Sequence, residues 1–292
     1  MTDTFVSAEL ASQPETWRAA ARLLPSFSDA LPQPGERVAV VGCGTSWFIA
    51  MSYAVAREQA GLGVTDAFAG SEYPIGREYD RVVTISRSGT TTEIVDLLQA
   101  LPGSRTVLVT AVPDSPAAAV ADDVVALPFA DERSVVQTRF ATTTLALLRA
   151  SIGDDVDALA TQAEAALALP IEDLLDAEQV TFVGRGPAVG LTFEAALKTR
   201  EAAQFWAESY PAMDYRHGPI AIAQPGRLVW SLGAAPEGLA DEVAATGARF
   251  VQHALDPIAG LVVVHRFAVA LAEGRGLDPD NPRSLTRSVI LT

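Results

Sequence analysis

The 292-residue chain contains little lysine, little cysteine and no long uninterrupted apolar run. Of its 21 basic residues only Lys198 is a lysine, and 36 acidic residues give a formal net charge of −15. This excess of negative charge argues against nucleic acid or an anionic membrane as a partner, because both need a basic face. A small phosphorylated ligand remains possible, since backbone N–H groups, hydroxyls and helix N-termini bind phosphate with few cations.

The single cysteine, Cys43, excludes an internal disulfide framework and is typical of a reducing compartment. The first twenty residues lack the basic and apolar regions of a secretory signal. The apolar stretch 260–272 is too short to span a bilayer and contains His265 and Arg266, so we interpret it as a buried helix. We therefore expect a cytoplasmic protein. Without a His/Cys cluster of ligand spacing, we expect no metal site.

Apolar runs bounded by turn residues alternate with amphipathic stretches, a pattern typical of βαβ units and parallel sheets. In the first half this pattern predicts strands at 37–42, 64–70, 81–86, 105–111 and 123–128, and helices at 14–31, 46–60, 90–101, 115–121, 132–152 and 154–168. Residues 179–202 then repeat the pattern of 37–58, with a strand, a V-G-x-G turn and a long helix. The predicted fold class is α/β, with a doubly wound, flavodoxin-like three-layer unit used twice. The expected domains are 1–170 and 171–292.

Two loops of the first half are rich in hydroxyls, and each joins a strand to a helix. They are 42–46, with the sequence GCGTS, and 86–93, with the sequence SRSGTTTE. Either loop alone would be explained by ordinary helix N-caps. Two such loops at equivalent places favour a phosphate site, because adjacent parallel strands bring them to one sheet edge. Neither has the glycine spacing of a dinucleotide site or the Gly-Lys-Ser/Thr of a P-loop, so no NAD, ATP or other cofactor is expected.

The segment 193–219 carries most of the candidate acid–base groups. Glu194, Lys198 and Glu201 have i, i+4 and i+7 spacing, so they share one face of a helix. On a solvated surface they would form an ordinary ion pair, whereas in a cleft they would provide a general base beside an ammonium. His217 lies in a loop next to Gly and Pro, which suits a titrating group. The other two histidines lie in apolar stretches and are expected in the core or on the surface.

Together these motifs resemble the SIS (sugar isomerase) family, especially the isomerase portion of glucosamine-6-phosphate synthase and stand-alone phosphosugar isomerases and deaminases. The resemblance covers nearly the whole chain. VGCGTS and ISRSGTTTE resemble the family's two phosphate loops, and ERSVVQTRFATTT (132–144) resembles the segment that lines the sugar site. VGRG…FEAALKTRE…AESYPAMDYRHGPIA resembles the catalytic stretch, and NPRSLTRSV (281–289) resembles the tail that closes over the sugar.

The resemblance implies an aldose–ketose isomerase or an amino sugar phosphate deaminase that moves a proton between C1 and C2 of an open-chain hexose 6-phosphate. It makes Glu201 the base, with Glu194 and Lys198 in support. It also gives His217 the task of assisting ring opening, in this family from the partner subunit, which implies a homodimer with a shared active site. The residues it assigns to the phosphate and the sugar are Gly44, Thr45, Ser46, Ser86, Arg87, Ser88, Thr91, Gln137 and Arg287.

The sequence departs from the family in two respects. The glutaminase portion of the synthase has no counterpart, so synthesis of glucosamine phosphate from glutamine is not expected. The family's tail lysine, which can form a Schiff base with a ketose, matches Arg287, whose protonated and delocalised nitrogens cannot form an imine. Purely acid–base chemistry, a binding role for Arg287, or loss of activity would each explain this change. The alternatives are therefore a non-catalytic phosphosugar-sensing SIS protein and a fructosamine-phosphate deglycase.

Overall fold

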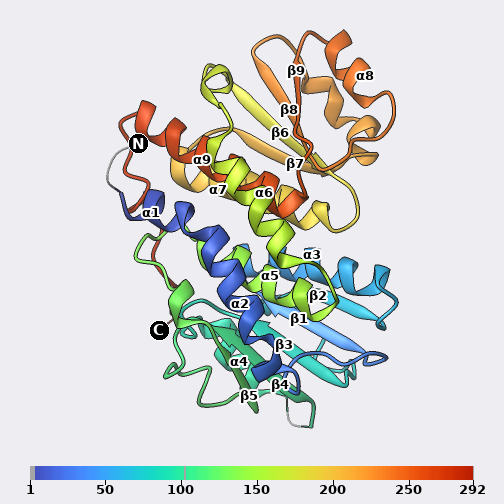
Figure 1. Ribbon diagram of the computed structural model, residues 1–292, viewed down its shortest axis with the longest axis vertical. Helices are drawn as coiled ribbons and strands as arrows, with labels where there is room; N and C mark the ends of the chain where they lie inside the picture. The colour runs from blue at the N-terminus through green and yellow to red at the C-terminus, as the bar shows by residue number, and fades with distance from the viewer. Residues whose placement is uncertain (1–3, 102, 292) are drawn as a thin grey trace. The chain divides into compact units, whose positions relative to one another are not determined.

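A computed structural model describes residues 4–101 and 103–291, which form two compact units, each with its own parallel sheet (Figure 1). The N-terminal unit contains 15–133, 137–157 and the chain from Thr286 onwards. The C-terminal unit contains the chain up to Pro14, together with 134–136 and 158–285. Each unit thus includes a short segment from the opposite end of the sequence: the first residues belong to the C-terminal unit, and the last residues belong to the N-terminal unit. The expected domain boundary at 170/171 stays a prediction.

The sheet of the N-terminal unit consists of parallel strands in the order β2-β1-β3-β4-β5 (Figure 1). The strands are β1 (Val38–Gly42), β2 (Thr65–Ala69), β3 (Arg81–Ile85), β4 (Arg105–Thr110) and β5 (Asp123–Ala126). β1 and β3 are buried along their whole length and rich in valine, as expected for strands covered on both faces. The strand order is the flavodoxin-like one, which confirms the predicted fold class.

Helices cover both faces of this sheet. They are α2 (Gln13–Phe27), α3 (Thr45–Gln59), α4 (Thr92–Gln99) and α5 (Arg139–Ser151). α3 packs on β1, β2 and α5, and the Trp17 Nε1 atom of α2 donates to Thr142 Oγ1 of α5 at 3.0 Å. On the other face, Ile94, Leu97 and Leu98 of α4 join a buried apolar cluster with β1, β3 and β4. The N-terminal unit therefore has its own core.

Two helix predictions in this unit are wrong. Residues 115–121 form turns instead of a short helix, because the Ala117 N–H donates to the Gly89 carbonyl at 3.0 Å. α5 begins at Arg139 instead of at residue 132. The Glu132 carboxylate accepts the N–H groups of Thr138, Arg139 and Phe140 at 2.6, 2.7 and 3.2 Å, so the chain before them must loop back around it.

The C-terminal unit repeats the same arrangement with parallel strands in the order β7-β6-β8-β9. Its elements are α1 (Phe5–Ala11), α6 (Val156–Ala168), β6 (Gln179–Gly184), α7 (Ala188–Ala203), β7 (Ala207–Pro211), β8 (Arg227–Leu232), α8 (Leu239–Ala245), β9 (Arg249–Gln252) and α9 (Pro257–Gly274). α7 packs against α9, and α8 contributes to a cluster with β6 and β8. α9 is long and apolar enough to span a membrane by length and composition, but 72% of it is buried inside the protein. It is the core helix that the sequence predicts.

The repeated V-G-x-G turn ends the first strand of each unit at a glycine, and the packing requires this. A Cβ atom on Gly42 would lie 2.4 Å from the backbone carbon of Ser46, and one on Gly184 would lie 2.9 Å from Thr192 Cγ2. In both units the helix after the turn therefore lies directly against the end of the strand.

We expect Gly42→Ala to lower the free energy of unfolding by about 1–3 kcal/mol, the usual cost of overpacking a filled site. Urea unfolding followed by circular dichroism measures this change. Gly76→Ala is the matched control, because a Cβ there would meet nothing within 4 Å. The control should stay within about 0.5 kcal/mol of the unaltered protein. Equal stabilities of the two variants would show that close packing does not require glycine at the turn.

Candidate functional site

The two hydroxyl-rich loops leave the same edge of the N-terminal sheet side by side. β1 and β3 are parallel neighbours, and Gly42 is the register partner of Ile85. The first hydroxyl loop (43–46) and the second hydroxyl loop (86–92) follow these partners directly. This is the point where the strand order reverses, and doubly wound sheets bind ligands there, outside the carboxyl ends of the strands.

Each loop ends at the N-terminus of a helix that has no side-chain cap. Gly44 precedes α3 and Thr91 precedes α4, and neither makes a capping hydrogen bond through its side chain. The simple N-cap explanation of the hydroxyls is therefore wrong for these two helices. Without side-chain caps, the positive end of each helix dipole and the first-turn N–H groups that no carbonyl accepts are available to an anion, although the Thr92 N–H of α4 donates to the Val289 carbonyl at 3.2 Å.

Two serines of the second hydroxyl loop accept hydrogen bonds from its own backbone. The N–H groups of Gly89 and Thr90 donate to Ser86 Oγ and Ser88 Oγ at 3.1 and 3.2 Å. A hydroxyl oxygen that accepts a hydrogen bond keeps its own proton to donate. Gly89 has φ of 62°, and a Cβ there would lie 1.9 Å from Ser115 Oγ, so only glycine fits.

Cys43 of the first hydroxyl loop is half-buried next to Glu93. Burial, together with the nearby carboxylate, raises the pKa of the thiol to about 11. The sulfur is therefore protonated at neutral pH and is a poor nucleophile. Thr45 and Ser46, which follow in the same loop, are both buried.

Arg87 and Arg287 are both engaged with protein groups. Arg87 Nη1 lies 3.7 Å from the carboxylate of the buried Glu132, and Arg87 Nη2 donates to the Arg287 carbonyl at 3.0 Å. The Arg287 guanidinium donates to the Asp131 carboxylate and to the Glu132 carbonyl. Gln137 is half-buried, and its Nε2 atom has no hydrogen-bond partner within residues 4–101 and 103–291.

In the C-terminal unit, α7 brings Glu194, Lys198 and Glu201 to one face, as predicted. Lys198 Nζ donates to Glu201 Oε2 and lies 3.7 Å from Glu194 Oε1. Glu194 and Lys198 are 0% and 1% exposed, and the Glu201 side chain is 18% exposed. The interpretation as a solvated surface pair is therefore wrong, because only Glu201 reaches solvent.

The three histidines have different surroundings. His217 is exposed at the end of a short 3₁₀ turn, Asp214–His217. His265 of α9 is buried, with Nδ1 3.4 Å from Gln13 Nε2, and burial together with the Lys198 charge lowers its pKa to about 3. Burial also lowers the pKa of His253. His265 is thus a neutral core histidine, as its apolar sequence neighbours predict.

Asp131 and Glu132 are site residues that the sequence patterns do not single out. Glu132 holds the start of α5 and contacts Arg87, although it lies well before both the helix and the next hydroxyl-rich segment. Helical periodicity does not connect Glu132 with α5, because the helix begins seven residues later. The one sequence signal for Glu132 is that it is the first residue of the segment 132–144, which resembles the family's sugar-site lining.

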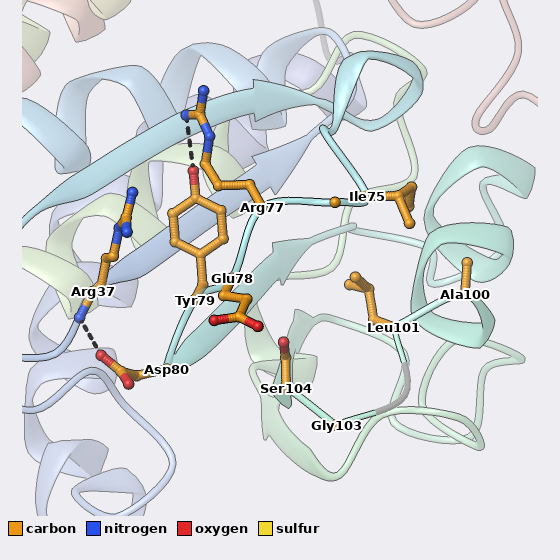
Figure 2. A pocket seen from close by; sticks show the side chains of 11 residues that line it. Arg37, Ile75, Arg77, Glu78, Tyr79, Asp80, Ala100, Leu101, Gly103 and Ser104 are labelled. Atoms are coloured by element: carbon orange, nitrogen blue, oxygen red, sulfur yellow. Dashed lines mark hydrogen bonds between the residues drawn. The ribbon is translucent and has the colours of Figure 1, made fainter.

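A separate cavity of about 750 Å³ lies on the opposite, amino edge of the N-terminal sheet (Figure 2). It is lined by residues that precede β1, β3 and β4. Two of its charged side chains bind neutral groups of the lining: Arg77 donates to the Tyr79 hydroxyl at 3.2 Å, and Asp80 accepts the backbone N–H of Arg37 at 2.7 Å. Its place at the amino edge separates it from the hydroxyl loops. Among the described residues, no group of three His, Cys, Asp or Glu could hold a metal ion.

No family profile matches the chain, but several known proteins are similar to it in sequence. The glutamine–fructose-6-phosphate aminotransferase (isomerizing) of Sulfurisphaera tokodaii is 27% identical, covering 87% of this chain and 50% of the relative. The enzyme of the same name from Zymomonas mobilis is 29% identical, covering 89% of this chain and 54% of the relative. The chain thus spans about half the length of the curated relatives it matches.

Among solved structures, the glucosamine-6-phosphate deaminase of Thermotoga maritima matches 99% of this chain and 100% of its own, with a TM-score of 0.85 and 21% identity. In sequence and in fold, the chain resembles the SIS family. The solved structure shows the fold alone at this identity, and the aminotransferases carry the resemblance in sequence.

Of the two units, the N-terminal one carries the hydroxyl loops. The equivalent loops of the C-terminal unit are 184–188, with the sequence GRGPA, and 233–238, with the sequence GAAPEG. Neither contains serine or threonine. The C-terminal unit instead carries its ionisable groups further along α7, so the two units differ in the chemistry they offer.

His265 predicts a specific sensitivity to acid. It is neutral in the fold, with a pKa of about 3, and titrates near its ordinary value of 6.5 in the unfolded chain. Between these values the unfolded chain binds more protons, so stability that is complete above pH 6.5 is lost as the pH falls toward 3. The loss should approach about 1.4 kcal/mol per pH unit in this window.

Urea unfolding between pH 7 and 4.5 tests this expectation. His265→Gln should have a shallower dependence on pH, whereas His217→Gln, at the exposed histidine, should keep the dependence of the unaltered protein. The same slope in the His265 variant would show that another group dominates.

Proposed function

We propose that the chain is a phosphosugar aldose–ketose isomerase or an isomerising amino sugar phosphate deaminase, acting on an open-chain hexose 6-phosphate. The observation that carries the proposal is the pair on α7 of the buried Lys198 with Glu201, which reaches solvent, in a chain whose other unit offers two hydroxyl loops at helix N-termini without side-chain caps. The names of its relatives, an isomerizing fructose-6-phosphate aminotransferase and a glucosamine-6-phosphate deaminase, support this reaction class.

The phosphate would be bound by the two hydroxyl loops. Thr45, Ser46, Ser86, Ser88 and Thr91 supply hydroxyl donors, and Gly44 allows a close approach of the backbone, with φ of 54°. The N-termini of α3 and α4 add N–H groups and positive dipole ends. A dianion can thus be held in a strongly acidic protein. The Gln137 amide, with Nε2 unpaired within the described chain, is suited to bind a sugar hydroxyl.

The Glu201 carboxylate would move the proton. It would remove the hydrogen from C2 of the open-chain aldose, giving an enediol after O1 gains a proton, and would return a proton to C1 as O2 loses its own. Lys198 holds this carboxylate in place, and Glu194 balances the ammonium charge. We assign ring opening to His217 from a partner subunit, so the proposal includes a homodimer with a shared active site. We also propose that the protein is cytoplasmic.

The same proton transfer serves a deaminase, but through an enolamine: Glu201 would remove the hydrogen from C2 as O1 gains a proton, and would return a proton to C1 as the C2 nitrogen loses one. This turns the C2 amine into an imine, and water would hydrolyse the imine to the ketose and ammonia. The proposal uses acid–base steps only, since Arg287 cannot form an imine with the substrate. Arg287 is also the one observation that favours a non-catalytic phosphosugar-binding protein as the second candidate.

We expect Glu201→Gln to lower kcat by about 10²–10⁴-fold, the usual contribution of a general base. Affinity for the phosphosugar should change little, because the phosphate donors remain. Calorimetric titration together with a coupled assay separates the two effects. Glu178→Gln, at an exposed glutamate of the same unit, is the control and should retain full turnover. A fully active Glu201→Gln enzyme would refute the role of the base.

A panel of hexose and hexosamine 6-phosphates, followed by NMR in D₂O, should show exchange of the C2 proton for at least one sugar. Release of ammonia identifies a deaminase, and a new ketose without ammonia identifies an isomerase. Reaction only with glycated amine phosphates would indicate a deglycase. Binding without exchange for any member of the panel would favour the non-catalytic candidate.

A further inference from the structure

Two arginines of the N-terminal unit meet at one glutamate. The Arg87 side chain faces the Glu132 carboxylate, and the Arg287 guanidinium donates to the Glu132 carbonyl. Arg87 also donates to the Arg287 carbonyl at 3.0 Å, and Arg287 pairs with Asp131. We call Arg87, Asp131, Glu132 and Arg287 the Glu132 clamp. It ties the second hydroxyl loop to the chain at residue 287.

Glu132 is a fixed point in this arrangement. It is 1% exposed, and its carboxylate accepts N–H groups from the first turn of α5. Thr138 Oγ1 donates to it as well, at 3.0 Å. A carboxylate at a helix N-terminus is favourably placed, and with this number of donors its position is well defined. The Arg87 and Arg287 guanidinium groups, which contact Glu132, are therefore also held in defined positions.

The 287–291 segment lies directly on the second hydroxyl loop. Thr90 Oγ1 donates to Ser288 Oγ at 3.0 Å, and the Thr92 N–H donates to the Val289 carbonyl at 3.2 Å. The Leu291 N–H donates to Thr92 Oγ1 at 2.9 Å. These bonds engage the Thr90 hydroxyl and both the N–H and the hydroxyl of Thr92. The 287–291 segment therefore orients this part of the second hydroxyl loop.

We propose that Arg287 is a positioning residue: through the Glu132 clamp it fastens the 287–291 segment to the second hydroxyl loop and so holds that loop in its phosphate-binding shape. This inference rests on the proposed function in one respect only, that the ligand of the loop is a phosphate. It gives Arg287 a role different from the direct sugar contact that the family resemblance implies. The guanidinium is committed to Asp131 and to the Glu132 carbonyl.

The chemistry of arginine makes this role testable. A planar guanidinium donates to two acceptors at once in a fixed fork, whereas an ammonium is a point charge on a flexible stem. If residue 287 acts on the carbonyl of the substrate, Arg287→Lys should restore the family's amine and increase turnover. If it is an anchor, Arg287→Lys should weaken phosphate binding in the same direction as Arg287→Ala.

The experiment compares Arg287→Ala, Arg287→Lys and Asp131→Asn in the 292-residue chain. Asp123→Asn is the matched control. It removes an arginine–carboxylate pair of the same unit, Arg105–Asp123, in which the side chains are 45% and 26% exposed, compared with 38% and 39% for Arg287 and Asp131. The first readout is amide hydrogen exchange at Thr92 and Leu291. The second is the Kd of inorganic phosphate, measured by calorimetry.

We expect Arg287→Ala to accelerate exchange at both amides and to raise the phosphate Kd about tenfold, the equivalent of one hydrogen bond to a charged group. Arg287→Lys should follow in the same direction. Asp131→Asn should raise the Kd about threefold, as expected for a partly exposed pair. The control should change neither quantity.

Unchanged exchange or an unchanged phosphate Kd in Arg287→Ala would overturn the proposal. A gain of kcat in Arg287→Lys, or a borohydride-trapped ketose adduct on that lysine, would also overturn it. Exchange and phosphate binding do not depend on turnover. Failure of the proposed enzyme activity would therefore leave these two readouts able to decide the role of Arg287.

Discussion

The parallel pairing of β1 with β3 is the constraint on which the candidate phosphate site depends. The register that sets Gly42 opposite Ile85 makes two loops, distant in sequence, leave the sheet next to each other. Glycine is essential at both, because Gly42 lies against Ser46 and Gly89 lies over Ser115. The backbone geometry thus gathers hydroxyls and two helix N-termini without side-chain caps at one edge of the sheet, and this arrangement needs few cations in a chain with a net charge of −15.

Glu194, Lys198 and Glu201 on α7 differ from the hydroxyl loops, because they place charged groups in the protein interior. Burying an ammonium is costly unless carboxylates compensate it, and Lys198 has Glu201 and Glu194 beside it. The neighbouring His265 is held neutral by the same burial and the same positive charge. Of the 21 lysine and arginine residues, Lys198 is the one lysine, and it lies where a compact ammonium fits between two glutamates.

Most strands and the long helices could be predicted from the sequence, because buried parallel strands appear as valine-rich runs between amphipathic stretches. The repeat could be predicted because the V-G-x-G turn, whose first glycine the packing requires, occurs once in each half. Glu194, Lys198 and Glu201 could also be placed on one face, since helical spacing determines this directly. Two features could not be found in this way: β7, whose short sequence AESYP carries little apolar signal, and the loop around Glu132. The Glu132 clamp depends on contacts over long stretches of sequence, such as Arg87 with residue 287, which no local pattern encodes.

The loops 184–188 and 233–238 occupy the same topological place as the hydroxyl loops but contain no hydroxyl side chains. The chain therefore contains two versions of one scaffold, of which only the N-terminal version has serine and threonine in these two loops. Substitutions that would destroy ligand binding in one copy should pass unnoticed in the other, provided that the glycine against the helix is kept. The glycine at the end of the first strand serves packing in both units, whereas the hydroxyl side chains of the N-terminal loops are not needed to build the fold.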